Sequence, residues 1–222
     1  MYSHIIFDLD GTLIESLLGI ATALNAALAD NNQPTHSTDA IRTFIGDGSH
    51  TLCARAMTDQ SEDSIERVHQ SFLKEYSKAW KNGTIVFEGV QELIHSLKSM
   101  DCSLSVLSNK PHSFTTEIVD YFFPDKPFDL VLGQREGIAK KPDPSGVHEL
   151  LGELGKSSNN SVLVGDSTID IVTARNAGIA SIAVTWGYND LDQLTSVSPK
   201  FTANNIEHLI EILTPKNVPA FR

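Results

Sequence analysis

Residues 7–16 read FDLDGTLIES, and they continue a short apolar run that begins at residue 5. That run is long enough for a buried strand and too short for a helix. Two carboxylates follow it, Asp8 and Asp10, and Gly11 then breaks the strand. Residues two apart on a strand point to the same face, so the two carboxylates are expected to meet at its carboxyl end. Ligands bind at that end of an open α/β sheet, and this stretch therefore predicts a functional site.

Two other interpretations of the same stretch must be considered. Asp and Gly both favour turns, so Asp-x-Asp-Gly also fits a surface turn. A calcium loop has its glycine at the sixth position and follows a helix, whereas here the glycine is fourth and follows a strand, which excludes calcium. The stretch alone leaves a turn and a site equally open, and the rest of the chain must decide between them.

The composition is that of an ordinary globular protein with an acidic balance. The chain has 222 residues, of which 41% are hydrophobic and 20% charged, and its formal net charge is -11. This length fits one large domain or a domain with an insertion. Nucleic-acid backbones need basic surfaces, so the charge argues against a nucleic-acid partner. An acidic protein that handles phosphate needs local cations, either a metal ion or a few placed lysines.

The remaining whole-chain features predict a cytoplasmic protein with no membrane partner. The two cysteines, Cys53 and Cys102, are far apart and lack metal-ligand spacing, so we expect reduced, buried thiols. No targeting segment is visible, and no stretch approaches the length of a membrane span. The sequence leaves the oligomeric state open.

The order of the apolar patterns predicts a core with an insertion. Ser16 is expected to cap a first helix, and further helical patterns but no strand follow up to residue 85. Short apolar strands then alternate with amphipathic helices, the strands falling at 104–107, 128–132, 162–164 and 182–184. This alternation is typical of an α/β fold with a doubly wound parallel sheet. We expect residues 1–14 and 86–222 to form this core, residues 15–85 to form an all-helical cap, and residues 214–222 to be a loose tail.

Polar side chains follow several of these strands. Asp8 and Asp10 end the first strand, Ser108 and Asn109 end the second, and Asp166 ends a later one. Since the carboxyl ends of parallel strands share one edge of the sheet, these groups are expected to meet there. The loop that carries Lys141 can reach the same edge. Few carboxylates together with phosphate and water oxygens suit Mg²⁺, and lysine suits phosphate, so the set fits phosphoryl transfer.

Four motifs in this order resemble those of the haloacid dehalogenase-like phosphatases. They are Asp8-Leu9-Asp10-Gly11-Thr12, Ser108-Asn109-Lys110, Lys141-Pro142 and Gly165-Asp166-Ser167-Thr168-Ile169-Asp170. The phosphoglycolate phosphatase branch is resembled further by Gly46-Asp47-Gly48 with Arg42 and Arg55, and by Thr185-Trp186-Gly187-Tyr188. The resemblance covers nearly the whole chain. One departure is Glu15, where many relatives carry Asp, and we interpret it as a hinge or helix-entry residue.

The resemblance implies a role for each matched residue. Asp8 would be the nucleophile that forms an aspartyl-phosphate, and Asp10 would be the general acid and base. Mg²⁺ would be held by the Asp8 carboxylate, the Asp10 backbone carbonyl and Asp166. Asp170 would not bind the ion itself but would support the groups around it. The phosphoryl group would be bound by Gly11, Thr12, Ser108, Asn109 and Lys141.

Some residues and functions stay open at this point. Lys140 is expected to be a solvated neighbour of Lys141, whereas Lys110 fits the surface and the site equally well. Arg42 and Arg55 either meet a substrate anion or lie on a solvated helix face. The favoured substrate is 2-phosphoglycolate. The alternatives are a sugar phosphomutase, a phosphatase for nucleotides or pyrophosphate, and a non-catalytic phosphate-binding module.

Overall fold

The computed structural model describes residues 2–214, and within them the main sheet has six strands that pair in parallel. The strand order across the sheet is β5-β4-β1-β6-β7-β8. The strands are β1 (His4–Phe7), β4 (Ser103–Pro111), β5 (Leu130–Gln134), β6 (Ser161–Gly165), β7 (Ala180–Val184) and β8 (Phe201–Ala203). The strand that precedes Asp8 therefore lies inside the sheet, between β4 and β6.

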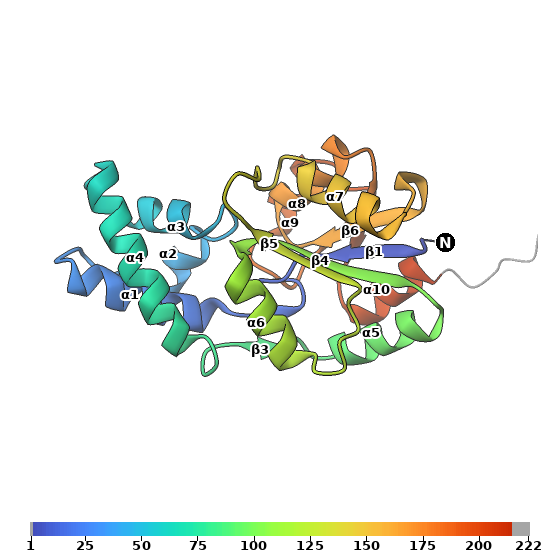
Figure 1. The fold of residues 1–222 in the computed structure, drawn as a ribbon, viewed down its shortest axis with the longest axis horizontal. Helices are drawn as coiled ribbons and strands as arrows, with labels where there is room; N and C mark the ends of the chain where they lie inside the picture. Colours follow the sequence, from blue (N-terminus) through green and yellow to red (C-terminus); the bar gives the residue numbers. More distant parts are fainter. Residues whose placement is uncertain (1, 215–222) are drawn as a thin grey trace, which may run out of the picture.

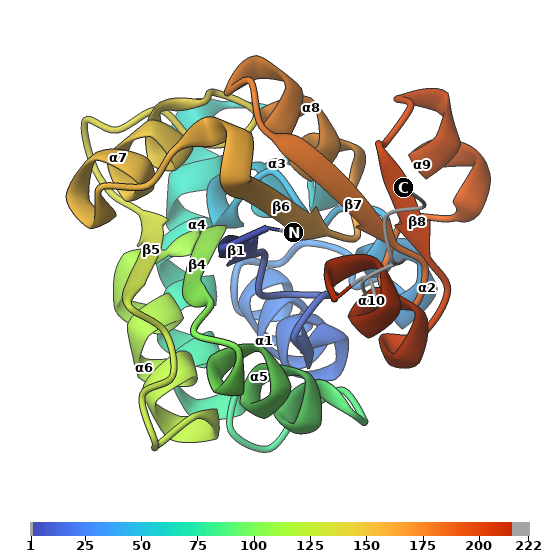
Figure 2. The ribbon, with the colours of Figure 1, turned by 90° about the vertical axis from the view of Figure 1, so that its right-hand side faces the viewer.

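Strand β1 is apolar on both faces because helices cover both faces of the sheet (Figures 1 and 2). Ile5 and Phe7 face a core cluster built with α5, α6 and α10, while Ile6 faces a second cluster built with α7 and α8. The helices are α5 (Val90–Ser99), α6 (His112–Phe122), α7 (Ser145–Leu154), α8 (Thr168–Asn176) and α10 (Ile206–Leu213). This arrangement confirms the predicted α/β fold with a doubly wound parallel sheet.

The segment of residues 16–84 is mostly helical and lies beside the sheet in Figure 1. Its helices are α1 (Leu17–Asp30), α2 (Thr38–Arg42), α3 (Ser49–Ala56) and α4 (Glu62–Ala79). The long helices α1 and α4 pack on each other through buried apolar side chains such as Leu24 and Phe72. We propose that residues 15–85 form a cap domain on a core of residues 1–14 and 86–222, and we call residues 15–85 the cap.

The expectation that residues 15–85 contain no strand is wrong at both ends. Strands β2 (Ile14–Glu15) and β3 (Ile85–Val86) pair antiparallel where the chain passes between core and cap. Each contributes only two residues, which is too short to give a periodic signal in the sequence.

Other differences from the expectations are local. Strand β4 continues through the motif to Pro111, and β5 begins at Leu130 instead of residue 128. The helix α9 (Leu191–Ser196) and the strand β8 were not expected. The Ser16 side chain does not cap α1, since no side-chain capping bond is present. Both cysteines are free and buried, as expected.

Two expectations concern other parts of the chain. Apart from Thr214, the tail expected at residues 214–222 lies outside the described residues. Among residues 2–214, no helix combines the length and the apolar character needed to cross a bilayer.

Candidate active site

Strands β4, β1 and β6 are neighbours in the sheet, and the polar residues that follow them lie together at the carboxyl ends of the strands, which we call the edge of the sheet. Phe7 lies in register with Val106 of β4 on one side and with Val164 of β6 on the other. The residues that follow these positions are Asp8, Ser108 and Asp166, and Ser108 and both aspartates are buried. The predicted convergence of polar groups at the carboxyl edge is therefore present in the fold.

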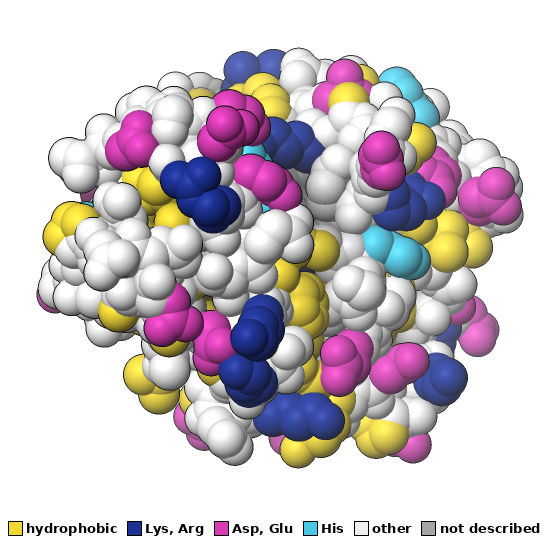
Figure 3. All heavy atoms as spheres, turned by 60° about the vertical axis from the view of Figure 1, so that its left-hand side comes forward, with side chains coloured by type: hydrophobic (Ala, Val, Ile, Leu, Met, Phe, Trp, Pro, Cys, Tyr) yellow, Lys and Arg dark blue, Asp and Glu magenta, His cyan; other side chains and the backbone are white. Residues whose placement is uncertain are grey.

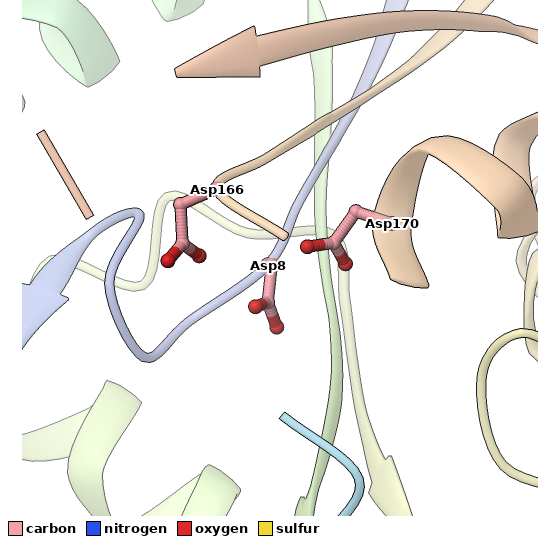
Figure 4. Close-up of side chains that lie close together, drawn as sticks. All are labelled: Asp8, Asp166 and Asp170. Carbon is pink, nitrogen blue, oxygen red and sulfur yellow. The ribbon is translucent and has the colours of Figure 1, made fainter. Parts of the chain in front are cut away.

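Three aspartates form a cluster at this edge (Figure 4). Oxygen atoms of Asp8, Asp166 and Asp170 all lie within 4.8 Å of one another. Burial raises the pKa of Asp8 to about 7 in spite of nearby Lys141, and the charges of Asp170 and Asp10 add to the rise. Burial also raises the pKa of Asp166, and the Asp8 and Asp170 charges act in the same direction. A cation bound between these groups would offset their repulsion.

The donor set of this cluster fits Mg²⁺. Carboxylate oxygens are hard ligands, and a site with few carboxylates leaves positions for water and phosphate. The Asp10 carboxylate is outside the cluster, so the expectation that Asp10 contributes its backbone carbonyl stays a prediction. Asp170 is occupied by other partners, as described next, which leaves Asp8 and Asp166 as the carboxylates that could face a metal ion.

Lys141 joins two of the aspartates. Its Nζ lies 2.8 Å from Asp8 Oδ1 and 2.6 Å from Asp170 Oδ1, and it also donates to the Leu107 carbonyl at 3.0 Å. Burial alone would lower the pKa of Lys141, but the two carboxylates more than offset this and hold the pKa above its usual value. All three protons of the ammonium group are thus used inside the protein.

Asp170 is fixed at the first turn of α8 by a capping box. Its carboxylate accepts from the backbone nitrogen of Ser167 at 3.1 Å and from Ser167 Oγ at 2.6 Å, while Ser167 Oγ accepts from the Asp170 nitrogen. This reciprocal arrangement satisfies donors at the helix start. Asp170 therefore positions Lys141, which in turn contacts Asp8.

The loop after β1 packs directly on Asp166. Thr12 Oγ1 donates to Asp166 Oδ1 at 3.1 Å, and the Tyr188 backbone nitrogen donates to Oδ2 at 2.7 Å. Gly11 has φ +84, and a Cβ at this position would overlap the Asp166 carboxylate. Glycine is therefore required here both by the backbone conformation and by the close approach.

Asn109 links the edge of the sheet to two loops. Its Nδ2 donates to the carbonyls of Lys141 and Gly46, each at 3.0 Å, and its Oδ1 accepts from the Lys141 nitrogen at 2.8 Å. The neighbouring Ser108 is buried and lines the same pocket. These bonds support a role for Asn109 in placing Lys141 and the loop of the cap that contains Gly46.

Asp10 has two partners that were not expected from the sequence. Lys110 Nζ donates to both of its oxygens, at 2.8 and 2.7 Å, and Ser16 Oγ donates to Oδ1 at 2.5 Å. The Lys110 side chain is only 7% exposed. Burial alone would lower its pKa, but Asp10 and Tyr76 more than offset this and hold the pKa above its usual value. Lys110 was open to a position on the surface or in the site, and in the structure it is buried and lines the pocket.

The cap loop with Gly46, Asp47 and Gly48 closes over the pocket, as expected. Gly46 and Gly48 line the pocket together with Asp8 and Asp10. Lys140 is exposed but not merely solvated, since its Nζ donates to the Asp47 carbonyl at 2.5 Å and to a threonine hydroxyl at 2.9 Å. This lysine thereby ties the loop before α7 to the cap.

The two arginines considered for an anion are engaged with protein groups. Arg42 donates to the carbonyls of Gly187 and Tyr188, at 2.5 and 3.1 Å. Arg55 pairs with Asp47 and donates to a backbone carbonyl at 3.0 Å. Neither arginine lines the pocket.

On the face of the molecule drawn in Figure 3, Lys and Arg side chains are interspersed with acidic ones.

Comparison with known proteins places this fold and site in a class of hydrolases. A family model described as haloacid dehalogenase-like hydrolase matches residues 5–184. The phosphoglycolate phosphatase of Haemophilus influenzae is 33% identical over 215 residues, covering 93% of this chain and 96% of the relative. The phosphoglycolate phosphatase of Vibrio parahaemolyticus is 31% identical over 216 residues, covering 94% of this chain and 95% of the relative.

A solved structure gives the same result in three dimensions. The crystal structure of a predicted phosphoglycolate phosphatase from Haemophilus somnus superposes with a TM-score of 0.89 at 30% identity, covering 95% of this chain and 97% of that chain. The chain therefore belongs to the haloacid dehalogenase-like hydrolase family. Within that family it is a phosphatase similar to the phosphoglycolate phosphatases, as its motifs predict.

Proposed function

We propose that this protein is an Mg²⁺-dependent phosphomonoester hydrolase that acts on a small phosphorylated metabolite through an aspartyl-phosphate, and that its substrate is 2-phosphoglycolate. The observation that carries the proposal is the position of Asp8. Its carboxylate is buried at the sheet edge, 2.8 Å from Lys141 Nζ and beside Asp166. Support for the substrate comes from relatives named phosphoglycolate phosphatase that match over almost their full length.

In the first half of the reaction, an oxygen of Asp8 attacks phosphorus opposite the ester oxygen. The new bond joins Asp8 to phosphorus, and the bond from phosphorus to the leaving oxygen breaks. Asp10 gives its proton to that oxygen, which therefore departs as a hydroxyl group and not as an alkoxide. Lys141 keeps the Asp8 carboxylate oriented, and its positive charge favours the incoming phosphate dianion.

In the second half, water replaces the alcohol beside Asp10. Asp10 takes a proton from the water as its oxygen bonds to phosphorus, and the bond to Asp8 breaks to release inorganic phosphate. Each group is thereby returned to its starting protonation state. The short bond from Ser16 Oγ to Asp10 Oδ1, 2.5 Å, holds the carboxylate that must act in both halves.

The metal ion is proposed at the acidic cluster. Asp8 and Asp166 would hold Mg²⁺ with the Asp10 backbone carbonyl, and Thr12 and the Tyr188 nitrogen fix Asp166. When bound, Mg²⁺ supplies positive charge that stabilises the negative oxygens of the transferring group. Ser108, which lines the pocket, is proposed to donate its hydroxyl to the phosphoryl oxygens. The backbone N–H groups of Gly11 and Thr12 donate to the Ile14 and Leu9 carbonyls, so these two residues are assigned to shaping the loop beside Asp166.

The experiment that tests this function is phosphate release with Mg²⁺ across a panel of phosphoesters. The panel contains 2-phosphoglycolate, sugar phosphates, nucleotides and pyrophosphate. Asp8→Asn is expected to lower turnover by about 10³-fold or more while the protein stays folded, and the exposed Asp125→Asn is the matched control. Mass spectrometry of quenched reactions should find one phosphoryl group on the wild-type peptide that contains Asp8.

Other outcomes would change the proposal in defined ways. A preference for nucleotides or sugar phosphates would keep the mechanism and replace the substrate. Isomerisation of a sugar phosphate that needs a bisphosphate activator would indicate a mutase. Ordinary activity in Asp8→Asn would exclude the aspartyl-phosphate.

A further inference from the structure

The pocket over the acidic cluster has two different walls. On the sheet side it is lined by carboxylates, lysines and polar groups, among them Asp8, Asp10 and Lys110. The opposite wall is mostly apolar, and its side chains come from the cap and from α6, namely Ile20, Ile45, Leu52, Phe72 and Phe114. A leaving group that extends from the phosphate therefore enters a region with little to bind a charge.

A leaving group with a carboxylate needs a cation in this region. Removing an ionised carboxylate from water without a partner is costly. The lysines and arginines that line the pocket are Lys110 and Lys141 alone, among the residues that the structure describes. Arg42 and Arg55 do not line it, and both make their bonds to protein groups. Only the two lysines can therefore serve.

Lys141 is already saturated. Its ammonium group contacts Asp8, Asp170 and the Leu107 carbonyl, and three protons are all that a lysine offers. It also lies beside Asp8, where the phosphoryl group is proposed to bind, and thus away from the leaving group.

Lys110 lies on the leaving-group side, because it contacts Asp10, the proposed acid for the leaving oxygen. Its Nζ places two bonds on the same carboxylate, at 2.7 and 2.8 Å. The Tyr76 ring lies beneath it, with the centroid 4.8 Å from Nζ. The Tyr76 hydroxyl is buried and has no hydrogen-bond partner within residues 2–214, although Tyr76 lines the pocket. A cation therefore lies on the side of the pocket where the leaving group must pass, next to a tyrosine whose hydroxyl is unpaired among residues 2–214.

We propose that Lys110 is a specificity-determining residue that binds the anionic group of the leaving alcohol, with the Tyr76 hydroxyl as a second donor. This inference rests on the proposed function and identifies how the site selects a carboxylated ester. One bond from Nζ passes from Asp10 to the substrate carboxylate, while the other bond and Ser16 keep Asp10 in place. No covalent bond of Lys110 or Tyr76 changes.

The test compares two esters of similar size in the full-length protein. 2-Phosphoglycolate carries a carboxylate, and 2-hydroxyethyl phosphate carries a hydroxyl in its place. The wild type is expected to prefer 2-phosphoglycolate in kcat/KM. In Lys110→Met, kcat/KM for 2-phosphoglycolate should fall by about 100-fold or more, and that for 2-hydroxyethyl phosphate by about 10-fold or less, so that the preference collapses.

Matched variants separate binding from general damage. Lys81 also lies over aromatic rings, those of Trp80 and Tyr121, but does not line the pocket, so Lys81→Met should leave both rates unchanged. Lys110→Arg keeps a cation and should keep a preference for 2-phosphoglycolate. Tyr76→Phe removes only the hydroxyl and should lower kcat/KM for 2-phosphoglycolate by about 5- to 10-fold without affecting the neutral ester.

The outcomes are distinct. Equal losses for both esters in Lys110→Met would overturn the inference, because they would mean that Lys110 only positions Asp10. The same holds if Tyr76→Phe and Lys110→Met both keep the wild-type preference. If the wild type itself shows no preference, the proposed substrate fails and the inference with it, before any variant is made.

Discussion

The hydroxyl of Tyr188 lies 3.0 Å from the backbone nitrogen of Ser16 and 3.1 Å from its Oγ. The same tyrosine donates its backbone N–H to Asp166, and Ser16 Oγ donates to Asp10. Hydrogen bonds at the two ends of Tyr188, its backbone N–H and its phenol oxygen, therefore link the acidic cluster through Ser16 to the carboxylate proposed as general acid. Ser16 is also the residue at which the chain enters α1.

Tyr188→Phe should therefore weaken both the fold and the reaction. The variant leaves the Ser16 nitrogen without a partner, and we expect a loss of about 1–2 kcal/mol in the free energy of unfolding. Because Ser16 also loses a partner that fixes its hydroxyl, kcat should fall by several-fold. Urea unfolding and steady-state kinetics check both, with the exposed Tyr121→Phe as control. If Tyr188→Phe has the free energy of unfolding and the kcat of the wild type, these hydrogen bonds contribute to neither quantity.

Binding of Mg²⁺ should be measurable by thermal unfolding, without an activity assay. Mg²⁺ that binds only the folded protein raises its stability, by about 2.7 kcal/mol at a concentration 100 times Kd. The wild type is therefore expected to melt at a higher temperature with Mg²⁺ than with a chelator. Asp166→Asn should lose this increase, and it should be at least as stable as the wild type without metal because one repulsive charge is gone.

The control for the metal experiment is Asp120→Asn, an exposed site on α6. It should keep the full response to Mg²⁺. A response that survives in Asp166→Asn would place the metal elsewhere.

Asn109→Ala should disturb the placement of Lys141. Three backbone groups lose their partner, two of them on Lys141 and one on the cap loop. We expect a loss of about 2 kcal/mol or more in stability and a lower kcat/KM. Thermal unfolding and kinetics check this against Asn159→Ala, an exposed asparagine. A variant with normal kinetics would mean that Lys141 is held well enough by Asp8 and Asp170.

His4 should make the fold sensitive to acid. It is buried, with Nδ1 3.2 Å from Ser161 Oγ and Nε2 2.9 Å from Ser105 Oγ. Burial lowers its pKa from 6.5 to about 4, Lys156 adds to the shift, and Asp129 opposes it. As the pH falls, this imidazole is protonated in the unfolded chain before it is protonated in the folded protein. The contribution of neutral His4 to the free energy of unfolding is therefore fully present above pH 6.5 and is lost as the pH falls from 6.5 to about 4.

The variant His4→Gln stays neutral and should remove this part of the pH dependence, which amounts to about 3 kcal/mol at most. Urea unfolding between pH 4 and 7 measures it, and His95→Gln, an exposed histidine on α5, should not alter the curve. If the free energy of unfolding depends on pH in the same way in the wild type and in His4→Gln, the pKa of His4 is not lowered in the folded protein.

The core and the cluster at its edge could be predicted because their signals are local. The run before Asp8 is apolar on both faces of its strand, so its burial is readable from the residues alone. Strand ends in a parallel sheet share an edge, so Asp8, Ser108 and Asp166 could be brought together without knowing the strand order.

What the sequence did not reveal depends on tertiary contacts or on very short elements. The pairing of Lys110 with Asp10 joins positions 100 residues apart, and no spacing in the chain indicates it. Strands β2 and β3 have two residues each. Helix α9 has only six, although its capping box, with Asp190 and Gln193, was a usable signal.

The pairing of β2 with β3 has an evolutionary consequence. Ile14 lies opposite Val86, so the chain leaves the core and returns to it at a single point. Any segment whose two ends meet at that spacing can be spliced in there without altering the register of the main sheet. The gene for such a protein can therefore gain, lose or exchange the stretch between these two strands while the main sheet is inherited intact, but a new stretch must again supply the partners that Ser16 and Gly46 give to Asp10 and Asn109.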